Sequence, residues 1–458
     1  MVIQGHSDEG KDAILTQSPT IQRVSQRLIV AIAASLLTGD TTLDLRDITQ
    51  AYPQAQSTLK RVILAYLPKE LEGKYPANTI IRVIRPLYGI AEAGVHWFAT
   101  YQGHHINKLD MSTSTYDPCL LIANGDKNNF GLVGMQTDDT LMLGTVTFAA
   151  NEEKEIQMAK FRTKPKTTLS PEISLDFNGC TLTMEGTTLG LKQKGQGAKI
   201  ELIDLKAPDR AQRYLEQRAR GAYIASICQP EAAFDLSVAA QAQSPKDEDH
   251  TKLNTRLEWQ MKSLQRGLRF VPVDLSTAKL MVFTDGSFAN NQDLSSQLGY
   301  ILTLVNETSG DNTFDIYGNL IHWSSTKCKR VTRSVLASEI YGMVSGFDLG
   351  LALTTTLKMV TDRLGLSAIP LIICTDSYSL YECLVKLGTT NEKRLMIDIM
   401  ALRQSYERRE IMEIRWINGK DNPADAMTKA SPNRALQDFI DSNRLMIRVE
   451  GFVERPQV

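Results

Sequence analysis

Two short apolar runs, each closed by a single aspartate, constrain the fold of this chain most strongly. Leu280–Phe283 runs into Thr284, Asp285 and a glycine, and Leu371–Cys374 runs into Thr375 and Asp376. Runs of this length bounded by turn residues predict strands. A strand that ends in an acidic residue and a turn presents that carboxylate at the edge of its sheet, so two carboxylates are expected at sheet edges.

The surrounding pattern mixes strands with helices. Further strands are expected over residues 299–304 and 321–324, and helices over 334–353, 377–387 and 392–409. This alternation predicts an α/β layer structure. It begins after Val271–Thr277, where Pro272 precedes a new pattern, so we place a domain boundary there.

The first half of the chain has a different pattern of predicted helices and strands. Ser18 and Pro19 suit the start of a helix, which the apolar spacing continues to Leu36, and a strand follows over 41–46. Residues 129–144 predict a hairpin whose tip carries two adjacent acids. Short strands are expected at 175–178, 180–184 and 189–193, then charged helical segments over 199–266, with a loop at 244–251.

Composition narrows the class of protein. Of 458 residues, 42% are hydrophobic and 22% charged, which excludes disorder as the dominant state. Lys and Arg number 51 against 52 Asp and Glu, so any nucleic-acid binding must use local basic surface. Residues 192–220 carry such an excess, and the alternative is a solvated helix face laced with ion pairs. The candidate contacts there are Lys192, Lys194, Lys199, Arg218 and Arg220.

Cysteine usage and apolar run length predict an intracellular, soluble protein. The six cysteines form no C-x-x-C pair, so zinc-knuckle and redox motifs are absent and a disulfide scaffold is not expected. No apolar run reaches the roughly 18 to 20 residues of a membrane span. The polar start lacks the apolar core of a signal peptide.

Four carboxylates of the second half form a candidate site. Asp285 and Asp376 end strands, Glu339 lies inside a predicted helix, and Asp425 follows Asn422-Pro423-Ala424 at a predicted helix start. Singly, these could be helix caps, a turn former or a surface residue. Together, such hard oxygen ligands could hold two Mg²⁺ ions, an arrangement that hydrolyses phosphodiesters.

These four motifs resemble the ribonuclease H domain of copia-type LTR retrotransposons. The matching residues are Thr284–Ser287, Ser338-Glu339, Thr375–Ser377 and Asn422–Lys429, the last of which follows the specific pattern N-P-A-D-x-x-T-K. The resemblance covers about residues 276–429 and implies cleavage of RNA in RNA–DNA hybrids. Many ribonucleases H carry a histidine shortly before the last aspartate, whereas Trp416–Lys420 contains none.

The first half resembles the reverse transcriptase of the same elements, over about residues 1–268. Asp47 with Tyr52 five residues later matches the first catalytic motif, and Gln136-Thr137-Asp138-Asp139 matches the x-x-D-D hairpin, with Gln-Thr in place of Tyr-Val. The resemblance implies that Asp47, Asp138 and Asp139 hold two Mg²⁺ ions and that Tyr52 is a steric gate against ribose. The alternative for Tyr52 is a core aromatic. Further blocks match in order: Pro86–Ile90, Trp97 and Tyr116–Leu120, with residues 195–197 and 217–233 similar to the thumb side of fungal members.

Two departures bear on polymerase activity. Residues 2–6 resemble the end of the fingers block, which implies that the chain starts inside that block, without its upstream basic contacts. Ile90–Ala93 stands where many relatives have Leu-Lys-Gln-Ala, so Glu92 would place a negative charge in the nucleotide pocket. The residues expected around the incoming nucleotide are Tyr52, Glu92 and Gln136.

The resemblances together imply an N-terminally truncated Pol fragment that joins an RNA-directed DNA polymerase to a ribonuclease H. We expect an α+β palm with a fingers remnant over 1–195, a helical thumb or connection over 196–272, an α/β ribonuclease H-like domain over 273–430 and a tail over 431–458. The palm should have a three- or four-stranded antiparallel sheet, and the second domain a mixed five-stranded one. The expected cofactor is Mg²⁺, two ions per site, with Mn²⁺ as a substitute.

The expected partners are RNA template, DNA primer, RNA–DNA hybrid and dNTP, with no membrane, and the oligomeric state stays open. The rival hypothesis is a non-catalytic relic that still binds nucleic acid, and an intermediate case keeps only ribonuclease H activity. By resemblance alone, the location is cytoplasmic virus-like particles, with later nuclear entry of the product.

Overall fold

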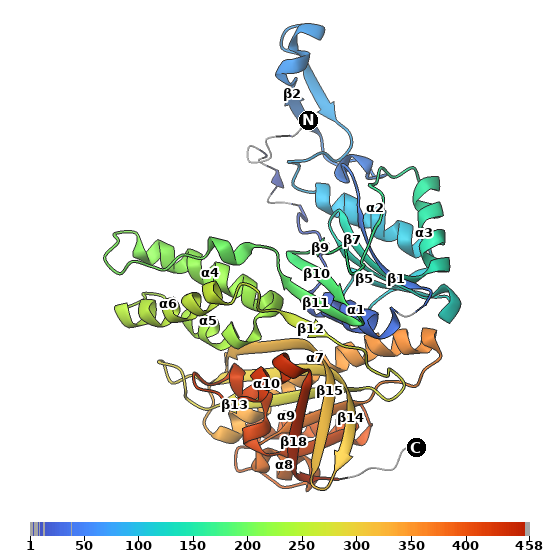
Figure 1. Ribbon diagram of the computed structural model, residues 1–458. Helices are drawn as coiled ribbons and strands as arrows, with labels where there is room; N and C mark the ends of the chain where they lie inside the picture. The colour runs from blue at the N-terminus through green and yellow to red at the C-terminus, as the bar shows by residue number, and fades with distance from the viewer. Residues whose placement is uncertain (1–2, 4–7, 9, 12–13, 38, 454–458) are drawn as a thin grey trace. The chain divides into compact units, whose positions relative to one another are not determined.

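The computed structural model describes residues 3, 8, 10, 11, 14–37 and 39–453. Most of segment 2–6, which we compared with the fingers block, lies outside these residues. The chain divides into two compact units, residues 1–26 with 39–169 and residues 27–38 with 170–458 (Figure 1). Each unit is described by itself. Helix α1 (Arg23–Leu36) begins in the first unit and continues into the second.

Unit 1 is built on a six-stranded sheet in which every neighbouring pair is antiparallel. Helices α2 (Ala93–Lys108) and α3 (Val146–Met158) flank it. The predicted strand and hairpin are confirmed as β1, β6 and β7, but the sheet has more strands than the three or four expected. Its order is β4 (Met111–Thr113), β5 (Leu120–Ala123), β6 (Gly131–Gln136), β7 (Asp139–Thr145), β1 (Thr41–Asp47) and β8 (Thr167–Thr168).

A separate two-stranded sheet in unit 1 consists of β2 (Ile63–Tyr66) and β3 (Ile80–Val83). One face packs on a small buried cluster that includes Leu59, Ile90 and Ala93. This cluster places Glu92, which directly precedes α2, beside the two-stranded sheet.

Unit 2 begins with a four-stranded antiparallel sheet and a helical group. Buried side chains from α4 to α6 pack into one core with Ile200 and Ile203, because each helix has one apolar face. The predicted strands and charged helices are confirmed, although α6 starts inside the expected loop 244–251. The elements are β9 (Leu175–Phe177), β10 (Cys180–Glu185), β11 (Thr188–Gln193), β12 (Leu268–Phe270), α4 (Arg210–Cys228), α5 (Ala233–Ala239) and α6 (Asp247–Lys262).

The remainder of unit 2 is a mixed α/β structure, as predicted. Strands β13, β16 and β17 run parallel, the other pairs are antiparallel, and the order closes on itself as β13-β14-β15-β18-β17-β16. The elements are β13 (Lys279–Ser287), β14 (Gln297–Gly310), β15 (Thr313–Lys327), α7 (Val335–Leu364), β16 (Leu371–Thr375), α8 (Tyr378–Val385), α9 (Met396–Glu407), β17 (Glu413–Ile417), α10 (Ala435–Ser442) and β18 (Arg444–Phe452).

The sixth strand corrects the expected five-stranded sheet and the expected tail. Residues 435–452 form α10 and β18, and β18 pairs with both β15 and β17. Arg448 strengthens this closure, because its guanidinium donates to the Asp421 carboxylate in the loop after β17. The segment is therefore part of the folded sheet rather than a tail.

Helix α7 lies unusually close to the sheet because of three glycines spaced four residues apart. The Ser334 hydroxyl caps its start, and Gly365 ends it with a φ of 69°. A Cβ at Gly342 would lie 2.9 Å from the Asp285 carbonyl oxygen, and one at Gly346 would lie 2.9 Å from Val282. Gly350 meets Val282 and Leu371 in the same way. Only glycine permits this approach, which brings the first turns of α7 onto the end of β13.

Two simpler expectations concern cysteines and membrane spans. All six cysteines lie in the described residues, buried and without a disulfide, as expected. Within the described part of the chain, the longest apolar helices fall short of what crossing a bilayer requires.

Candidate functional site

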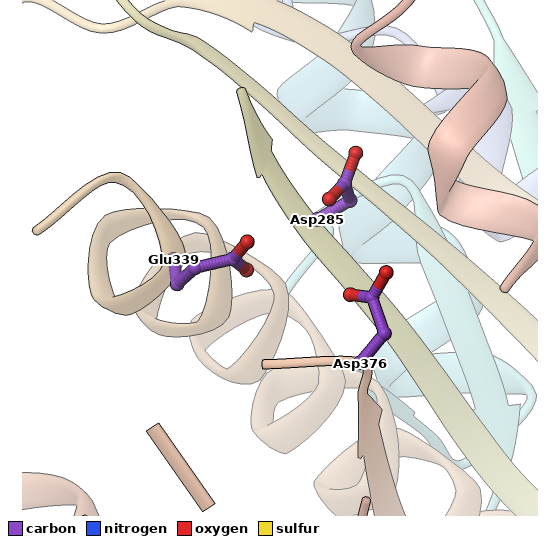
Figure 2. Close-up of side chains that lie close together, drawn as sticks. All are labelled: Asp285, Glu339 and Asp376. Carbon is purple, nitrogen blue, oxygen red and sulfur yellow. The ribbon is translucent and has the colours of Figure 1, made fainter. Parts of the chain in front are cut away.

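Three of the predicted carboxylates of the second half meet at the end of β13. The parallel pairing of Thr284 with Thr375 sets Asp285 and Asp376 side by side at the same sheet edge. Helix α7 brings Glu339 to them, and carboxylate oxygens of the three residues all lie within 4.8 Å of one another. Figure 2 shows the three side chains converging from strand β13, from the residue after strand β16 and from helix α7. We call these three residues the acidic cluster.

Two residues of the acidic cluster, Asp285 and Glu339, are buried, and Asp376 is half-buried. Only 3% of Asp285 and 6% of Glu339 is exposed. Burial and then the neighbouring acids raise the pKa of Glu339 well above its usual range, and burial and then Asp285 raise that of Asp376 to about 6. Burial also raises the pKa of Asp285. Charged carboxylates held this close require positive charge nearby.

The donor set fits a divalent cation. The Glu339 Oε2 atom is buried and has no hydrogen-bond partner among the described residues. A buried carboxylate oxygen without a partner is costly unless a cation meets it. Three hard oxygen ligands at this spacing are what Mg²⁺ or Mn²⁺ prefers, so Asp285, Glu339 and Asp376 could hold such an ion.

Asp425, the fourth predicted carboxylate, is placed differently. It is buried in a short 3₁₀ helix (Pro423–Met427) and lies outside the acidic cluster. One of its oxygens accepts the Asn433 backbone N–H at 2.7 Å, and the other pairs with the Lys429 ammonium. The same Lys429 ammonium lies 3.9 Å from Asp285, so Asp425 and Asp285 are neighbours.

The other polar residues of the N-P-A-D-x-x-T-K segment explain its spacing. The Asn422 amide donates to the Thr284 carbonyl at 3.0 Å and to Asp376 at 3.2 Å. The Thr428 hydroxyl donates to Asp285. Asn422, Thr428 and Lys429 thus each contact a carboxylate, which the sequence pattern indicated only as a motif and not as separate contacts.

In unit 1, the β1–β7 pairing brings two of the predicted acids together. Asp47 at the end of β1 lies directly opposite Asp139 at the start of β7. Asp138 sits in the hairpin turn, where its carbonyl accepts the Ile48 N–H at 2.9 Å. These three acids do not reach the spacing of the acidic cluster in the described residues. The Lys164 ammonium lies 2.7 Å from Asp47, a contact that sequence reasoning missed.

The hairpin tip holds a strained backbone. Thr137 has a φ of 54°, which a β-branched residue rarely adopts. The Trp97 indole N–H donates to the Thr137 carbonyl at 2.8 Å and anchors the turn. The anchored turn fixes the backbone of Asp138, which follows Thr137 between β6 and β7.

The predicted nucleotide-pocket residues have distinct surroundings. The Tyr52 ring packs on Tyr88 with centroids 4.7 Å apart, and burial, then the charge of Asp138, raises the pKa of Tyr52. The buried Gln136 Oε1 has no hydrogen-bond partner in the described residues. Glu92 accepts two hydrogen bonds of 2.7 Å from Arg61, which lower its pKa. Its negative charge is therefore neutralised within the protein.

A buried ionic network behind β1 is a further feature that the sequence analysis missed. The Arg46 guanidinium donates to Glu152 at 2.7 and 2.6 Å and to Glu153 at 2.6 Å. Arg46 precedes Asp47 and is 1% exposed, so the network ties the end of β1 to α3. The strand sequence TTLDLRD mixes polar and apolar residues, so it offered no signal that Arg46 is buried.

The predicted basic surface is partly engaged in ion pairs. Lys194 lies 3.3 Å from Asp176, and the Arg220 guanidinium donates to the Lys199 carbonyl at 2.5 Å. Lys192 reaches Gln265 at 3.4 Å, and Arg218 is half-buried on α4. The side chains of Lys194, Lys199 and Arg220 remain exposed. The segment therefore keeps features of both alternatives, a basic surface for nucleic acid and a solvated face with ion pairs.

No family model matches the chain. It is 22% identical over 484 residues to the retrovirus-related Pol polyprotein from transposon TNT 1-94 of Nicotiana tabacum, a match that covers 95% of this chain and 33% of the relative. The chain thus spans about a third of the length of the curated relative that it matches.

Two solved structures represent the structural matches. The foamy viral protease-reverse transcriptase in complex with double-stranded DNA is 12% identical, with 90% of this chain and 62% of that chain covered and a TM-score of 0.48. A compost ribonuclease H1, LC11-RNase H1, is 16% identical, with 34% and 98% covered and a TM-score of 0.24. Over nearly its whole length, this chain is similar to part of a Pol polyprotein from a transposon, as the order of its motifs predicts.

Proposed function

We propose that this chain is an RNA-directed DNA polymerase joined to a ribonuclease H, both dependent on divalent metal. The observation that carries the proposal is the acidic cluster, whose buried Glu339 oxygen has no partner. Carboxylates gathered at one sheet edge, with no nucleophilic serine or cysteine in the cluster, suit metal-assisted phosphoryl chemistry better than covalent catalysis.

For hybrid cleavage, Asp285, Glu339 and Asp376 would hold the metal, and Asp425 would complete the set. A pair of divalent ions held there would supply an activated water and charge to neutralise the leaving oxygen. The residues of the chain position these ligands: Asn422 orients Asp376, and Thr428 orients Asp285. Because Asp285 and Glu339 are buried, their charges act in a medium where they are weakly screened.

For DNA synthesis, Asp47, Asp138 and Asp139 would hold the metal at the β1–β7 end. Burial and then the charge of Asp138 raise the pKa of Tyr52, which supports a position for its ring near the proposed nucleotide site. The partners under this proposal are an RNA template, a DNA primer, their hybrid and dNTPs. The location under this proposal is the virus-like particle in the cytoplasm.

One observation favours a second candidate, a ribonuclease H that carries an inert polymerase unit. In the described residues, the unit 1 acids are not gathered as tightly as the acidic cluster, and Lys164 pairs with Asp47. A fully non-catalytic protein that binds nucleic acid is the remaining alternative.

One gel separates these possibilities. Purified chain, Mg²⁺ and a labelled DNA primer on a labelled RNA template report primer extension and RNA cleavage together. Growth of the primer with shortening of the RNA supports the full proposal. Shortening of the RNA alone supports the second candidate, and no change in either strand contradicts both.

Gly342→Ala should reduce RNA cleavage strongly, because the new Cβ would meet the backbone of Asp285 at 2.9 Å and push α7 away from β13. Overpacking of this kind costs about 1–3 kcal/mol of stability. The matched control is Gly103→Ala in α2, where the nearest atom would be 3.8 Å away, so neither activity should fall. Cleavage by Gly342→Ala at the wild-type rate would contradict the role of the close approach.

A further inference from the structure

Lys429 is a cation that the proposed function leaves without a role. Its ammonium pairs with Asp425 and lies 3.9 Å from the Asp285 Oδ2 atom. The preceding residue, Thr428, donates its hydroxyl to Asp285. Two consecutive residues therefore satisfy two carboxylates of the proposed metal site from within the chain.

The charge of Lys429 reaches the whole acidic cluster. Burial raises the pKa values of Asp285, Glu339 and Asp376, and the Lys429 ammonium opposes that rise at each of the three. An ammonium that favours the charged carboxylates does electrostatically part of what a bound metal ion would do. Two cations cannot share the same carboxylate oxygens without repelling each other, so Lys429 and a metal ion compete.

The surroundings leave Lys429 room to move. Its side chain is 45% exposed, whereas that of Asp425 is 8% exposed. Lys429 also lines a cavity of about 980 Å³ within unit 2, together with Arg256 and Trp259 of α6 and Asn290 of the β13–β14 loop. The long, flexible lysine stem can therefore turn away from Asp425 without displacing packed groups.

We propose that Lys429 is an exchangeable counter-ion, which neutralises Asp425 and Asp285 while the site is free of metal and turns into the adjoining cavity when those carboxylates bind a divalent ion. The inference rests on the proposed function in one respect, namely that the acidic cluster binds metal. It makes Lys429 a positioning residue that sets the metal affinity.

The test measures metal binding without turnover. Mn²⁺ is titrated into the full chain, and the free ion is followed by electron paramagnetic resonance. Lys429→Met should bind Mn²⁺ roughly tenfold more tightly than the wild type, as loss of a competing partly buried ion pair predicts. Lys429→Arg keeps the charge and should stay near the wild-type affinity. Lys420→Met, at an exposed lysine five residues before Asp425, is the matched control and should change nothing.

Equal or weaker Mn²⁺ binding by Lys429→Met would overturn the proposal, because a lysine that merely orders Asp425 would weaken binding when removed. Should the methionine variant fail to fold, Lys429→Gln replaces it, since an amide can still donate to Asp425. The glutamine variant should also bind Mn²⁺ more tightly than the wild type.

A double-mutant cycle adds a second readout. When Asp425→Asn has already removed the partner, Lys429→Met should tighten Mn²⁺ binding less than it does alone. An undiminished effect would count against exchange at Asp425. If the wild type itself binds no Mn²⁺, the proposed function fails, whereas binding that Lys429→Met leaves unimproved defeats this inference alone.

Discussion

Asp376→Asn should abolish cleavage of the RNA strand in a hybrid while leaving primer extension intact. Asp376 follows β16 and contributes a carboxylate to the acidic cluster, and an amide lacks the charge that holds a divalent ion. We expect a loss of roughly a thousandfold or more, as removal of a group that stabilises a developing charge typically gives. Both activities can be measured on the same labelled primer and template.

The same variant should be at least as stable as the wild type without metal, which separates loss of chemistry from loss of fold. Burial raises the pKa of Asp376 to about 6 in the folded chain, above its ordinary 3.8. The wild type therefore loses stability as pH rises from about 4 through 6, and the asparagine variant does not. Denaturant midpoints in EDTA should favour Asp376→Asn at pH 7.5, and the difference should shrink at pH 5.

Asp362→Asn is the matched control for this prediction. Asp362 lies on α7, the helix that carries Glu339, but it is exposed and pairs with Lys358. Its substitution should leave RNA cleavage within about twofold of wild type, since an exposed pair of this kind contributes little. Full cleavage by Asp376→Asn would show that the acidic cluster is not the site of cleavage.

Asp138→Asn should abolish DNA synthesis and spare RNA cleavage. The backbone of Asp138 accepts the Ile48 N–H, and this bond does not depend on the carboxylate, so the hairpin should persist. Loss of the charge alone should reduce primer extension by roughly a thousandfold. Extension should be measured with the RNA cleavage of the same sample as an internal standard.

A spectroscopic readout accompanies the loss. Burial and then Asp138 raise the pKa values of Tyr52 and Tyr88, so Asp138→Asn should lower both in an ultraviolet titration. The control is Asp40→Asn, at an exposed residue just before β1, which should change neither extension nor the tyrosines. Undiminished extension by Asp138→Asn would remove the hairpin from the proposed polymerase site.

The site residues that the sequence predicted best are the two carboxylates that stand at the end of a predicted strand. Asp285 and Asp376 end apolar runs, so parallel pairing of those runs had to bring them together. Glu339 was expected on a helix, but its approach depends on glycines that no periodicity argument assigns to a face. The sequence could not show that Asp425 lies apart from the other three carboxylates. Its ion pair with Lys429 is a contact in space, which no sequence pattern reveals.

The missed elements share a physical cause. In strand β18 exposed residues alternate with partly buried ones and one buried residue, Ile447, so its polar positions resemble a tail. Strands β14 and β15 extend well beyond the predicted 299–304 and 321–324, because their outer halves lose the apolar pattern while the ladder continues from Asn306–Tyr317 to Gly310–Thr313. Backbone hydrogen bonding between strands does not depend on side-chain polarity, so a strand can continue where its apolar pattern has ended.

The glycine spacing of α7 also determines which single substitutions we expect to inactivate the protein. At Gly342, Gly346 and Gly350, one added carbon atom meets the sheet, whereas most surface positions accept substitution freely. Under the proposed function, a variant with one such change would therefore keep its carboxylate motifs and most of its stability, yet lose RNA cleavage. These three positions, together with the carboxylates, are where we expect substitutions that separate inactive variants from active ones.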